Sequence, residues 1–580
     1  MKLTLKNSPT THFCDALRTN WNGPCRLALI CALLMAFAAA PLHAQLTYKD
    51  LWDFACSIGC SPVDYGQLTP GPDGNLYGTT QSGGSGAGTI FNVSTNGSYT
   101  PLYIFSGGTD GAFPLGGLTA VYDSSSGATI FYGTTSAGGD PSSLGTLFSY
   151  NPSAVPPFTT LHVFNGTDGQ FPATPPTAGP DGNLYGVTGS GTTYRYCLMS
   201  PCPKGGPFTQ LPHSVLSGTT SPLYLADGLL YGTTESGGTS GDGTVFYMTP
   251  TVAGTIGPNK PISFNGTNGS SPQGPLTQGN LYGVTKFGGA NNNGTIFYVN
   301  VHNQIVTMYN FSPLAGGTND DGANPVAGLL ASGDGYLYGT TTIGGAFGYG
   351  TIFRIPTSAP FTFTKLIDFT GAAGSGIPGA NTDTTLLLNT DSLFYGLSQG
   401  AVGFGSGGTG SFYALSPQSG GPHILIMEGP VWLAPGVTVE ILGDGLTGAA
   451  SVSFAGVPAQ FQPGSNTYLI AQVPSAAVDG LITVTLATGA QVESQVAMHI
   501  LPIITNLDPP SGAVGTQVGI VGGGFAGAKK VTFGGVKATS FTVNSPTLIL
   551  ATVPAGAKTG KVKVTTPNGT ATSKEKFTVN

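Results

Sequence analysis

Residues 73–80 read Asp73-Gly74-Asn75-Leu76-Tyr77-Gly78-Thr79-Thr80, and the Tyr-Gly core of this stretch returns throughout the first two thirds of the chain. Its copies are Tyr77-Gly78-Thr79-Thr80, Tyr132-Gly133-Thr134-Thr135, Tyr185-Gly186-Val187-Thr188, Tyr231-Gly232-Thr233-Thr234, Tyr282-Gly283-Val284-Thr285, Tyr338-Gly339-Thr340-Thr341 and Tyr395-Gly396-Leu397-Ser398. Successive copies lie 55, 53, 46, 51, 56 and 57 residues apart, which is the length of one four-stranded propeller blade. The repeat therefore predicts an all-β, seven-bladed β-propeller.

Each repeat contains four short runs that are rich in aromatic or β-branched residues and bounded by turn formers, as strands are. An apolar run such as residues 117–121 comes first, and the Tyr-Gly run is second. The third run has the pattern Gly-Thr-aliphatic-Phe, at 88–91, 145–148, 243–246, 294–297 and 350–353. The fourth ends in Phe, at Phe105, Phe164, Phe264, Phe311 and Phe369. We name these runs strands a to d, from the axis of the propeller outward.

The repeated Tyr and Phe are expected to fill the space between neighbouring sheets, because no single blade can bury both of its faces. Stacking of the Tyr ring on a carbohydrate is the alternative. The glycine after the Tyr is expected where the backbone approaches closely at the crowded inner strands.

The two ends of the array predict how the ring closes. Residues 46–54 match a fourth strand but have no a, b or c strand of their own, whereas the seventh repeat has strands a to c (384–389, 393–398 and 411–416) and then runs into different sequence. We expect the N-terminal strand to complete the last blade, which removes free sheet edges.

These motifs resemble the bacterial GloVer (Gloeobacter/Verrucomicrobia) tandem repeat, with its D-G-N-L-Y-G-T-T, G-G, G-T-(I/V)-F and D-G-x-x-P elements, over residues 45–419. The resemblance implies an exported or surface-attached propeller and assigns no chemistry. The third repeat departs from the pattern, because Gly191-Thr192-Thr193-Tyr194 replaces the third motif and no fourth strand ending in Phe is clear before Tyr224. Its blade is expected to be irregular.

Two further domains are predicted after residue 419. Residues 502–580 have short alternating runs between Gly/Pro turns, typical of a small β-sandwich. The order P-x-S-G, G-T-x-V, G-x-x-F, V-x-F-G-G and V-P, from Pro509 to Pro554, resembles the IPT/TIG immunoglobulin-like domain. Residues 420–501 resemble a more divergent copy through 435–439, 443–446, 452–456 and 473–474. Such domains are spacers or protein-binding modules.

Composition agrees with a turn-rich β protein. The 580 residues include 92 Gly, and only 8% are charged, which excludes a charged helical bundle and a charge-rich disordered chain. Residues 1–44 have the features of a signal peptide, with a basic start, an apolar run from Leu27 to Ala40 and cleavage predicted near Ala44. The apolar run is shorter than the roughly 20 residues that cross a bilayer, so no transmembrane helix is expected in the mature chain. The protein is expected to be secreted or held at the cell surface.

The cysteines that remain after cleavage form two close pairs, Cys56/Cys60 and Cys197/Cys202. An even count in an exported chain favours two disulfides, each closing a small loop. A single metal site of four thiolates is the alternative, but C-x3-C with C-x4-C lies outside the tightest zinc spacings.

Charge is distributed unevenly along the mature chain. Residues 45–501 contain 7 Lys and Arg against 23 Asp and Glu, a net charge of −16, which argues against nucleic acid as a partner. Residues 502–580 contain 8 Lys and Arg against 2 Asp and Glu, a net charge of +6. Their lysines, which include Lys529, Lys530, Lys537, Lys558, Lys561 and Lys563, either offer a basic face to an anionic envelope polymer or simply keep the domain soluble.

No catalytic motif stands out. The histidines of the predicted mature chain are scattered, there is no HExxH, no Gly-x-Ser-x-Gly elbow on a predicted strand-to-helix turn and no phosphate loop. No catalytic residue, metal ligand or cofactor is therefore predicted.

One candidate binding face follows from propeller topology, in which d-to-a and b-to-c loops emerge on the same side. The d-to-a loops repeat Asp-Gly-x-x-Pro, with Asp110, Asp168, Asn268 and Asp321 at the first position. The b-to-c loops on that side are the Gly-Gly segments. A ring of Asp and Asn there could bind sugar hydroxyls or a structural cation such as calcium. The alternative is turn chemistry, in which Asp accepts backbone N–H groups.

These features predict an exported, non-catalytic binding or scaffold protein that recognises an extracellular polysaccharide or protein through the propeller face. We expect it to be a monomer. A propeller enzyme that degrades polysaccharides, as a hydrolase or lyase, is the first alternative, and it requires acids that converge at catalytic distance. A purely structural surface protein, which binds no ligand, is the second.

Overall fold

The computed structural model describes residues 47–62, 67–179, 181–198, 202, 206–214, 218, 221–226, 228–250, 256–277, 281–371, 382–399, 410–416, 426–427, 432–443, 445–494 and 497–580. Residues Leu46–Asn580 form one compact unit. The predicted signal peptide lies outside the described residues. The fold is all-β, and the only helical element in the described part of the chain is one 3₁₀ turn, Leu446–Gly448.

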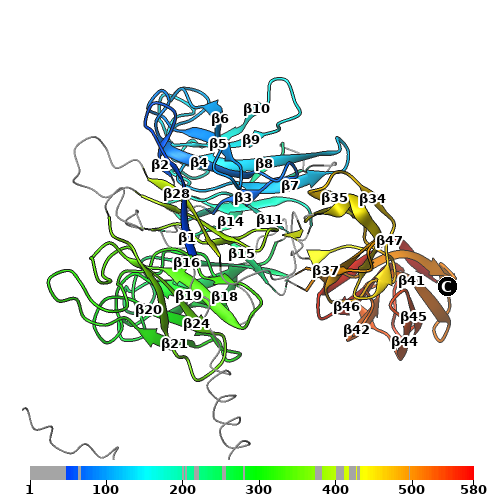
Figure 1. The fold of residues 1–580 in the computed structure, drawn as a ribbon. Helices are drawn as coiled ribbons and strands as arrows, with labels where there is room; N and C mark the ends of the chain where they lie inside the picture. Colours follow the sequence, from blue (N-terminus) through cyan, green and yellow to red (C-terminus); the bar gives the residue numbers. More distant parts are fainter. Residues whose placement is uncertain are drawn as a thin grey trace, which may run out of the picture. The chain divides into compact units, whose positions relative to one another are not determined.

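In the described residues between Thr47 and Ser416 the strands form seven sheets, and Figure 1 labels many of these strands. Their strands are, sheet by sheet, β2 (Cys60–Pro62), β3 (Thr69–Pro70), β4 (Leu76–Ser82), β5 (Thr89–Val93) and β6 (Tyr99–Ile104); β7 (Thr119–Asp123), β8 (Ala128–Thr135), β9 (Thr146–Tyr150) and β10 (Phe158–Val163); β11 (Thr177–Ala178), β12 (Leu184–Val187), β13 (Thr192–Tyr196) and β14 (Phe208–Ser214); β15 (Tyr224–Ala226), β16 (Leu229–Thr234), β17 (Thr244–Met248) and β18 (Ile256–Ser263); β19 (Tyr282–Thr285), β20 (Thr295–Val299) and β21 (Ile305–Asn310); β22 (Leu330–Ala331), β23 (Tyr336–Thr340), β24 (Thr351–Pro356) and β25 (Thr364–Asp368); and β26 (Leu387–Leu388), β27 (Phe394–Ser398), β28 (Ser411–Ser416) and β1 (Thr47–Asp53).

Strand β1 closes the array. β1 pairs antiparallel with β28, from Thr47 opposite Ser416 to Asp53 opposite Ser411, and so becomes the fourth strand of the last sheet. A buried apolar cluster lies between each sheet and the next, and one that contains Phe54, Phe91, Tyr395 and Phe412 joins the last sheet to the first. The sheets therefore form a closed β-propeller whose outermost edges are the d strands.

Two contacts that recur among the sheets explain the repeated motif. A Cβ atom on Gly133 would lie 2.4 Å from the Phe148 ring, so the Phe of strand c covers the glycine of strand b. The second Thr of Tyr-Gly-Thr-Thr bonds the Thr of Gly-Thr-aliphatic-Phe: the hydroxyls of Thr135 and Thr146 are 2.8 Å apart, and the same pair recurs in four other sheets. A larger residue in place of the glycine would clash with the ring of strand c. A residue without a hydroxyl in place of either threonine would remove the hydrogen bond between strands b and c.

The tyrosine is a packing residue, as predicted. Six of the seven repeated tyrosines are less than a tenth exposed, and only Tyr231 is half-buried. In four copies the phenol also donates a hydrogen bond to the Asp four residues earlier, as Tyr77 does to Asp73 at 2.9 Å. These hydroxyls complete the turn between strands a and b.

As the sequence indicates, the fourth strand of the third repeat does not end in Phe. β14 pairs with β13 and supplies that strand, but its phenylalanine, Phe208, stands at the start of the strand instead of the end. The ring of Phe208 stacks on His162 of the second sheet, with centroids 3.5 Å apart.

Two β-sandwiches with the same strand order follow the propeller. The first consists of β29 (Ile426–Met427), β31 (Thr438–Leu442), β35 (Tyr468–Gln472) and β34 (Phe461–Pro463) opposite β33 (Val457–Pro458), β32 (Ala449–Phe454), β36 (Ile482–Leu486) and β37 (Gln491–Glu493), with β30 (Trp432–Leu433) and β38 (His499–Ile500) as a short parallel pair. The second consists of β39 (Ile503–Asp508), β41 (Gln517–Gly523), β45 (Leu548–Thr552) and β44 (Phe541–Ser545) opposite β43 (Val536–Lys537), β42 (Lys530–Phe533), β46 (Gly560–Thr566), β47 (Gly569–Val579) and β40 (Ser511–Gly512). Each sandwich has its own apolar core.

Candidate functional site

The four predicted binding residues lie in the d-to-a loops, and each is held by its own loop. The carboxylate of Asp110 accepts hydrogen bonds from the Tyr103 hydroxyl (3.0 Å), the Ser106 amide (2.8 Å) and the Ser106 hydroxyl. Burial alone would raise the pKa of Asp110, but these hydrogen bonds together lower it below its usual value. The carboxylate is thus kept ionised as the acceptor of the turn.

The other three positions repeat this arrangement. Asp321, which is 5% exposed, accepts from the Tyr309 hydroxyl (2.7 Å), the Ser312 amide (2.9 Å) and the Ser312 hydroxyl. Asp168 accepts from the amide of Asn165 and bonds His162 Nε2 at 3.0 Å. Asn268 accepts from the Asn265 amide at 2.9 Å. The polar ring therefore builds the loops, and its contact with a ligand or a cation stays a prediction.

A different position in these loops points outward. The residue just before the loop proline is Phe113, Phe171, Ser271 or Asn324, and its φ lies between 53° and 55° in all four loops. Its amide donates to a carbonyl in the b-to-c loop of the preceding sheet, for example Phe113 to Ala87 at 2.8 Å. The residue before the proline therefore has a left-handed backbone and forms a hydrogen bond between neighbouring sheets.

Phenylalanine at this position is costly on two counts. A bulky residue with positive φ is strained, whereas Asn visits that conformation readily. The rings of Phe113 and Phe171 are also 41% and 48% exposed, so they gain little from burial. Strain and exposure together make this position a candidate for contact with a ligand.

The b-to-c loops add two exposed phenylalanines to the same side. Phe287 is 37% and Phe347 is 56% exposed. Phe287 pairs with Ser270 of the adjacent d-to-a loop, and the Lys286 ammonium lies 5.4 Å from the centre of its ring. In the described part of the propeller, every exposed phenylalanine thus lies on this side, which we call the loop face and define by Phe113, Phe171, Phe287 and Phe347. The exposed large apolar residues on the other side are Val155 and Val301, at the tips of c-to-d turns.

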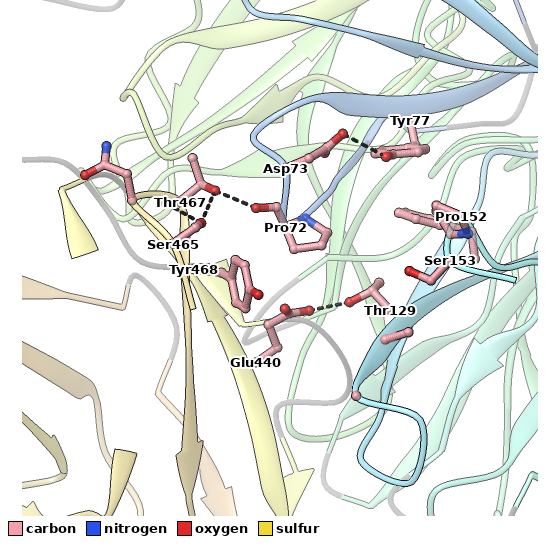
Figure 2. Close-up of a pocket in the computed structure, with 14 residues that line it drawn as sticks. Pro72, Asp73, Tyr77, Thr129, Pro152, Ser153, Glu440, Ser465, Thr467 and Tyr468 are labelled. Atoms are coloured by element: carbon pink, nitrogen blue, oxygen red, sulfur yellow. Dashed lines mark hydrogen bonds between the residues drawn. The ribbon is translucent and has the colours of Figure 1, made fainter. Parts of the chain in front are cut away.

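The opposite side of the propeller contacts the first sandwich around a cavity of about 510 Å³ (Figure 2). The cavity is lined by a-to-b and c-to-d turns, including Asp73 and Thr129, and by Glu440 and Tyr468 of the sandwich. Thr129 donates to the carboxylate of Glu440, which is 2% exposed, and Thr467 donates to the carbonyl of Pro72. These hydrogen bonds join the propeller to the first sandwich, so the cavity belongs to the contact between the two domains. The loop face is on the other side of the propeller and is not part of this contact.

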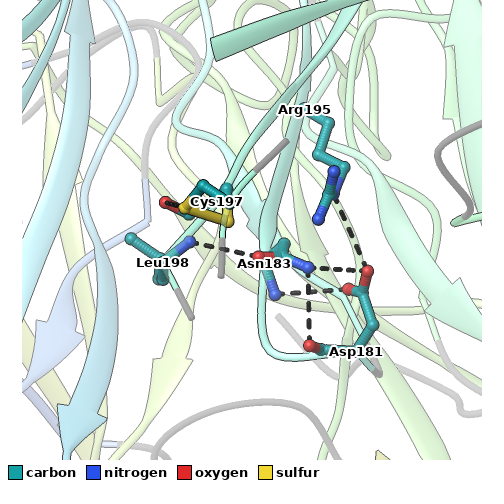
Figure 3. The surroundings of a disulfide bond; sticks show 6 residues. Asp181, Asn183, Arg195, Cys197 and Leu198 are labelled. Atoms are coloured by element: carbon teal, nitrogen blue, oxygen red, sulfur yellow. Dashed lines mark hydrogen bonds and ion pairs between the residues drawn. A yellow bond between two sulfur atoms is a disulfide. The ribbon is translucent and has the colours of Figure 1, made fainter. Parts of the chain in front are cut away.

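Both predicted disulfides are present, Cys56–Cys60 and Cys197–Cys202. The second follows β13 in the sheet that departs most from the repeat (Figure 3). Beside it the Leu198 amide donates to the Asn183 side chain at 3.1 Å, and Asn183 donates to Asp181 at 2.8 Å. The residue that follows the first cysteine of this disulfide is therefore bonded to the a-to-b turn of the same sheet.

No group of three or more His, Cys, Asp and Glu side chains is placed to hold a metal ion within the described ranges. No helix among them is long and apolar enough to cross a membrane. The repeated sequence pattern pointed to the Asp and Asn residues at the start of the d-to-a loops. It did not point to Phe113 and Phe171 in the same loops. The available signal was an aromatic residue before the proline in Asp110–Pro114 and Asp168–Pro172, where the other two loops carry Ser271 and Asn324.

Comparison with known proteins identifies the repeats. The family model of the Gloeobacter/Verrucomicrobia repeat matches residues 37–199, 119–279 and 218–427, and that of the IPT/TIG domain matches residues 502–579. No curated protein matches the chain.

Solved structures are similar at low identity. A fungal alcohol oxidase of the AA5 family, in complex with copper, has a TM-score of 0.42 and 14% identity over 79% of this chain and 100% of its own. The WD40 propeller domain of Doa1 has a TM-score of 0.38 and 10% identity over 64% and 98%. SGBP-B from a xyloglucan utilization locus of Bacteroides uniformis has a TM-score of 0.15 and 19% identity over 27% of this chain and 48% of its own, so the match spans about half of that protein. Scores at this level carry no argument about function.

Proposed function

The chain belongs to the Gloeobacter/Verrucomicrobia repeat family, and we propose that its propeller is a non-catalytic module that binds a neutral polysaccharide on the loop face. The observation that carries the proposal is the exposure of Phe113 and Phe171 in left-handed backbone. Both features lower the stability of the free protein, and a ligand that covers the rings would offset that loss.

The chemistry of the loop face suits a sugar. Aromatic rings present flat apolar faces that can stack on the C–H faces of pyranose rings, and nearby hydroxyl and amide groups can bond sugar hydroxyls. Ser271 and Asn324 supply such groups at the equivalent positions of the fifth and sixth sheets. The net charge of −16 over residues 45–501 would repel an acidic polymer, which favours a neutral one.

The carboxylates favour binding over hydrolysis. A glycosidase needs two acids about 5 to 10 Å apart that are free to transfer protons or attack the sugar. Asp110, Asp168 and Asp321 are instead each bonded to groups of their own loop or strand. We further propose that the protein acts outside the cytoplasm, secreted or at the cell surface, where its two disulfides persist.

The test is a panel of neutral polysaccharides in affinity electrophoresis with residues 45–580, followed by calorimetry on any polymer that retards the protein. The double variant F113N/F171N keeps a residue that tolerates the left-handed backbone, and we expect it to lose affinity at least tenfold. The matched control, V155N/V301N, removes the exposed apolar residues of the other side and should bind like the parent.

Three outcomes would contradict the proposal: no binding to any neutral polysaccharide, equal loss in both variants, or an unchanged affinity in F113N/F171N. Release of reducing ends or unsaturated products from a bound polymer would show that the protein is an enzyme.

A further inference from the structure

The second sandwich contains a sheet with two chemically different faces. Its strands lie in the order β40-β47-β46-β42-β43. Val531, Phe533, Val562, Val564 and Phe577 point into the core and are at most 1% exposed. Because side chains alternate along a strand, the residues between them point to the other side, which we call the outer face.

Strand register places five lysines on the outer face. Thr532 is opposite both Lys537 and Lys563, Lys530 is opposite Thr565, and Lys561 is opposite Lys576. Directly paired residues point to the same side of a sheet. Of these five lysines only Lys561 is half-buried, and the other four are exposed.

One of these pairs is unfavourable for folding. Lys561 and Lys576 are direct cross-strand partners, and like charges in that position destabilise a sheet. The Lys561 ammonium donates to the carbonyl of Lys574, not to a carboxylate. Within residues 502–580, all of which the structure describes, no lysine lies within 4.0 Å of a carboxylate as an ion pair. The outer face thus carries uncompensated positive charge.

We propose that the outer face binds an acidic polysaccharide, whose carboxylates approach the ammonium groups of Lys537, Lys563 and Lys576. Lys537 and Lys563 are two strand spacings apart, roughly 10 Å, so one extended polymer could reach both. Thr532 on β42 lies between these two lysines, and Thr572 on β47 is opposite Lys563.

The composition of the face argues against nucleic acid. Residues 502–580 contain no Arg, the residue that recognises phosphate in a bidentate manner. The exposed residues of β42, β43, β46 and β47 are Lys, Thr and the single Glu575, without the aromatic rings on which bases of a single strand stack. A lysine acts as a point charge, which suits carboxylates spaced along a flexible polymer.

This site is separate from the loop face in both domain and ligand. The loop face belongs to the acidic part of the chain, with a net charge of −16, whereas the outer face belongs to a domain of net charge +6. The two proposals can fail independently, because one is tested with neutral and the other with acidic polymers.

The experiment measures retention of residues 45–580 by polygalacturonate, a linear uronate polymer, in parallel with neutral dextran and with duplex DNA. We expect binding to polygalacturonate that weakens steeply as salt rises from about 50 to 200 mM, because salt screens exposed charges. The variant K537Q/K563Q should lose at least tenfold in affinity. The control K529Q/K558Q removes the same charge from lysines outside the strands of this sheet and should retain most of the binding.

A second variant separates binding from folding. K576Q removes the like-charge pair with Lys561, so we expect it to bind polygalacturonate more weakly and to melt at an equal or higher temperature. Equal loss in K537Q/K563Q and K529Q/K558Q, no binding by the parent, or tighter binding to duplex DNA would each overturn the proposal.

Discussion

The d-to-a loops of the second and third sheets share one backbone with those of the fifth and sixth sheets, but they display different side chains. In all four the polar first residue accepts hydrogen bonds from its loop or strand, and the residue before the proline has φ between 53° and 55°. That last position carries Phe113 and Phe171 in one pair of loops and Ser271 and Asn324 in the other. The scaffold is thus constant and the displayed residue varies, which separates positions that build the propeller from positions that can bind.

The largest expected loss of stability comes from substituting the glycine of the Asp-Gly-x-x-Pro loop. Gly111 has φ of 100°, and a Cβ atom there would lie 2.1 Å from the Thr135 hydroxyl oxygen. We expect Gly111→Ala to lower the free energy of unfolding by about 3 kcal/mol, since strain and a clash add. Chemical denaturation measures the change.

Gly86→Ala is the matched control for that substitution. Gly86 has nearly the same φ, 98°, but no atom lies within 4 Å of the place that a Cβ atom would take. Only the strain should remain, about 1 kcal/mol. Equal losses at Gly86 and Gly111 would show that the loop is not crowded.

Removing the hydrogen-bond acceptor at the first position of the loop should cause the next largest loss of stability. Asp321→Ala leaves the Tyr309 hydroxyl and the Ser312 amide without their acceptor in a buried position, which costs about 2 kcal/mol. Asn268→Ala removes a single amide contact in an exposed loop and should cost about half as much. Thermal melting of the two variants tests the order, and a larger loss for Asn268→Ala would contradict it.

Exchanging the residue before the proline between the two kinds of loop should change the free energy of unfolding by a smaller amount, and in opposite directions. Phe113→Asn should raise the free energy of unfolding by up to about 1 kcal/mol, because Asn accepts positive φ more readily. Asn324→Phe should lower it by a similar amount. Chemical denaturation of both variants measures the two changes. If both substitutions destabilise, Phe113 makes contacts that outweigh its strain, and the comparison between the loops fails.

The smallest expected effect is a dependence on pH. The pKa of Asp110 is lowered in the folded protein, so its contribution to stability is complete above the unfolded value of 3.8 and is lost as pH falls through the folded pKa. The difference in melting temperature between the parent and Asp110→Asn should therefore shrink as the pH falls from neutral to below that unfolded value. A difference that stays constant would show that the Asp110 carboxylate adds nothing as a charge.

Much of the architecture follows from the sequence because the repeats are local and periodic. The Tyr-Gly and Gly-Thr motifs mark strands b and c, and the unmatched run at residues 46–54 predicts the pairing of β1 with β28. The fourth strand of the third sheet could not be located from the sequence, because it lacks the terminal Phe that marks the others, and only its pairing with β13 reveals β14.

The candidate site was less predictable. Asp110, Asp168, Asn268 and Asp321 stand out in the sequence because they repeat, but repetition reflects their structural role in the turns. Phe113 and Phe171 stand before the loop proline in only two of the four loops, and that position alone does not show whether a ring is exposed or buried. Exposure depends on how neighbouring sheets pack, which a single repeat does not contain.

The amino-acid sequence was sufficient to predict most of the strands, the turns, the closing strand and the two cysteine pairs, because each depends on residues close together in the chain or on a regular period. Folding in three dimensions was needed to show which aromatic rings stay exposed on the loop face and which lysines share the outer face of the last sheet. Both surfaces depend on the register between strands and on the packing between sheets, and these bring together residues whose spacing along the chain carries no pattern.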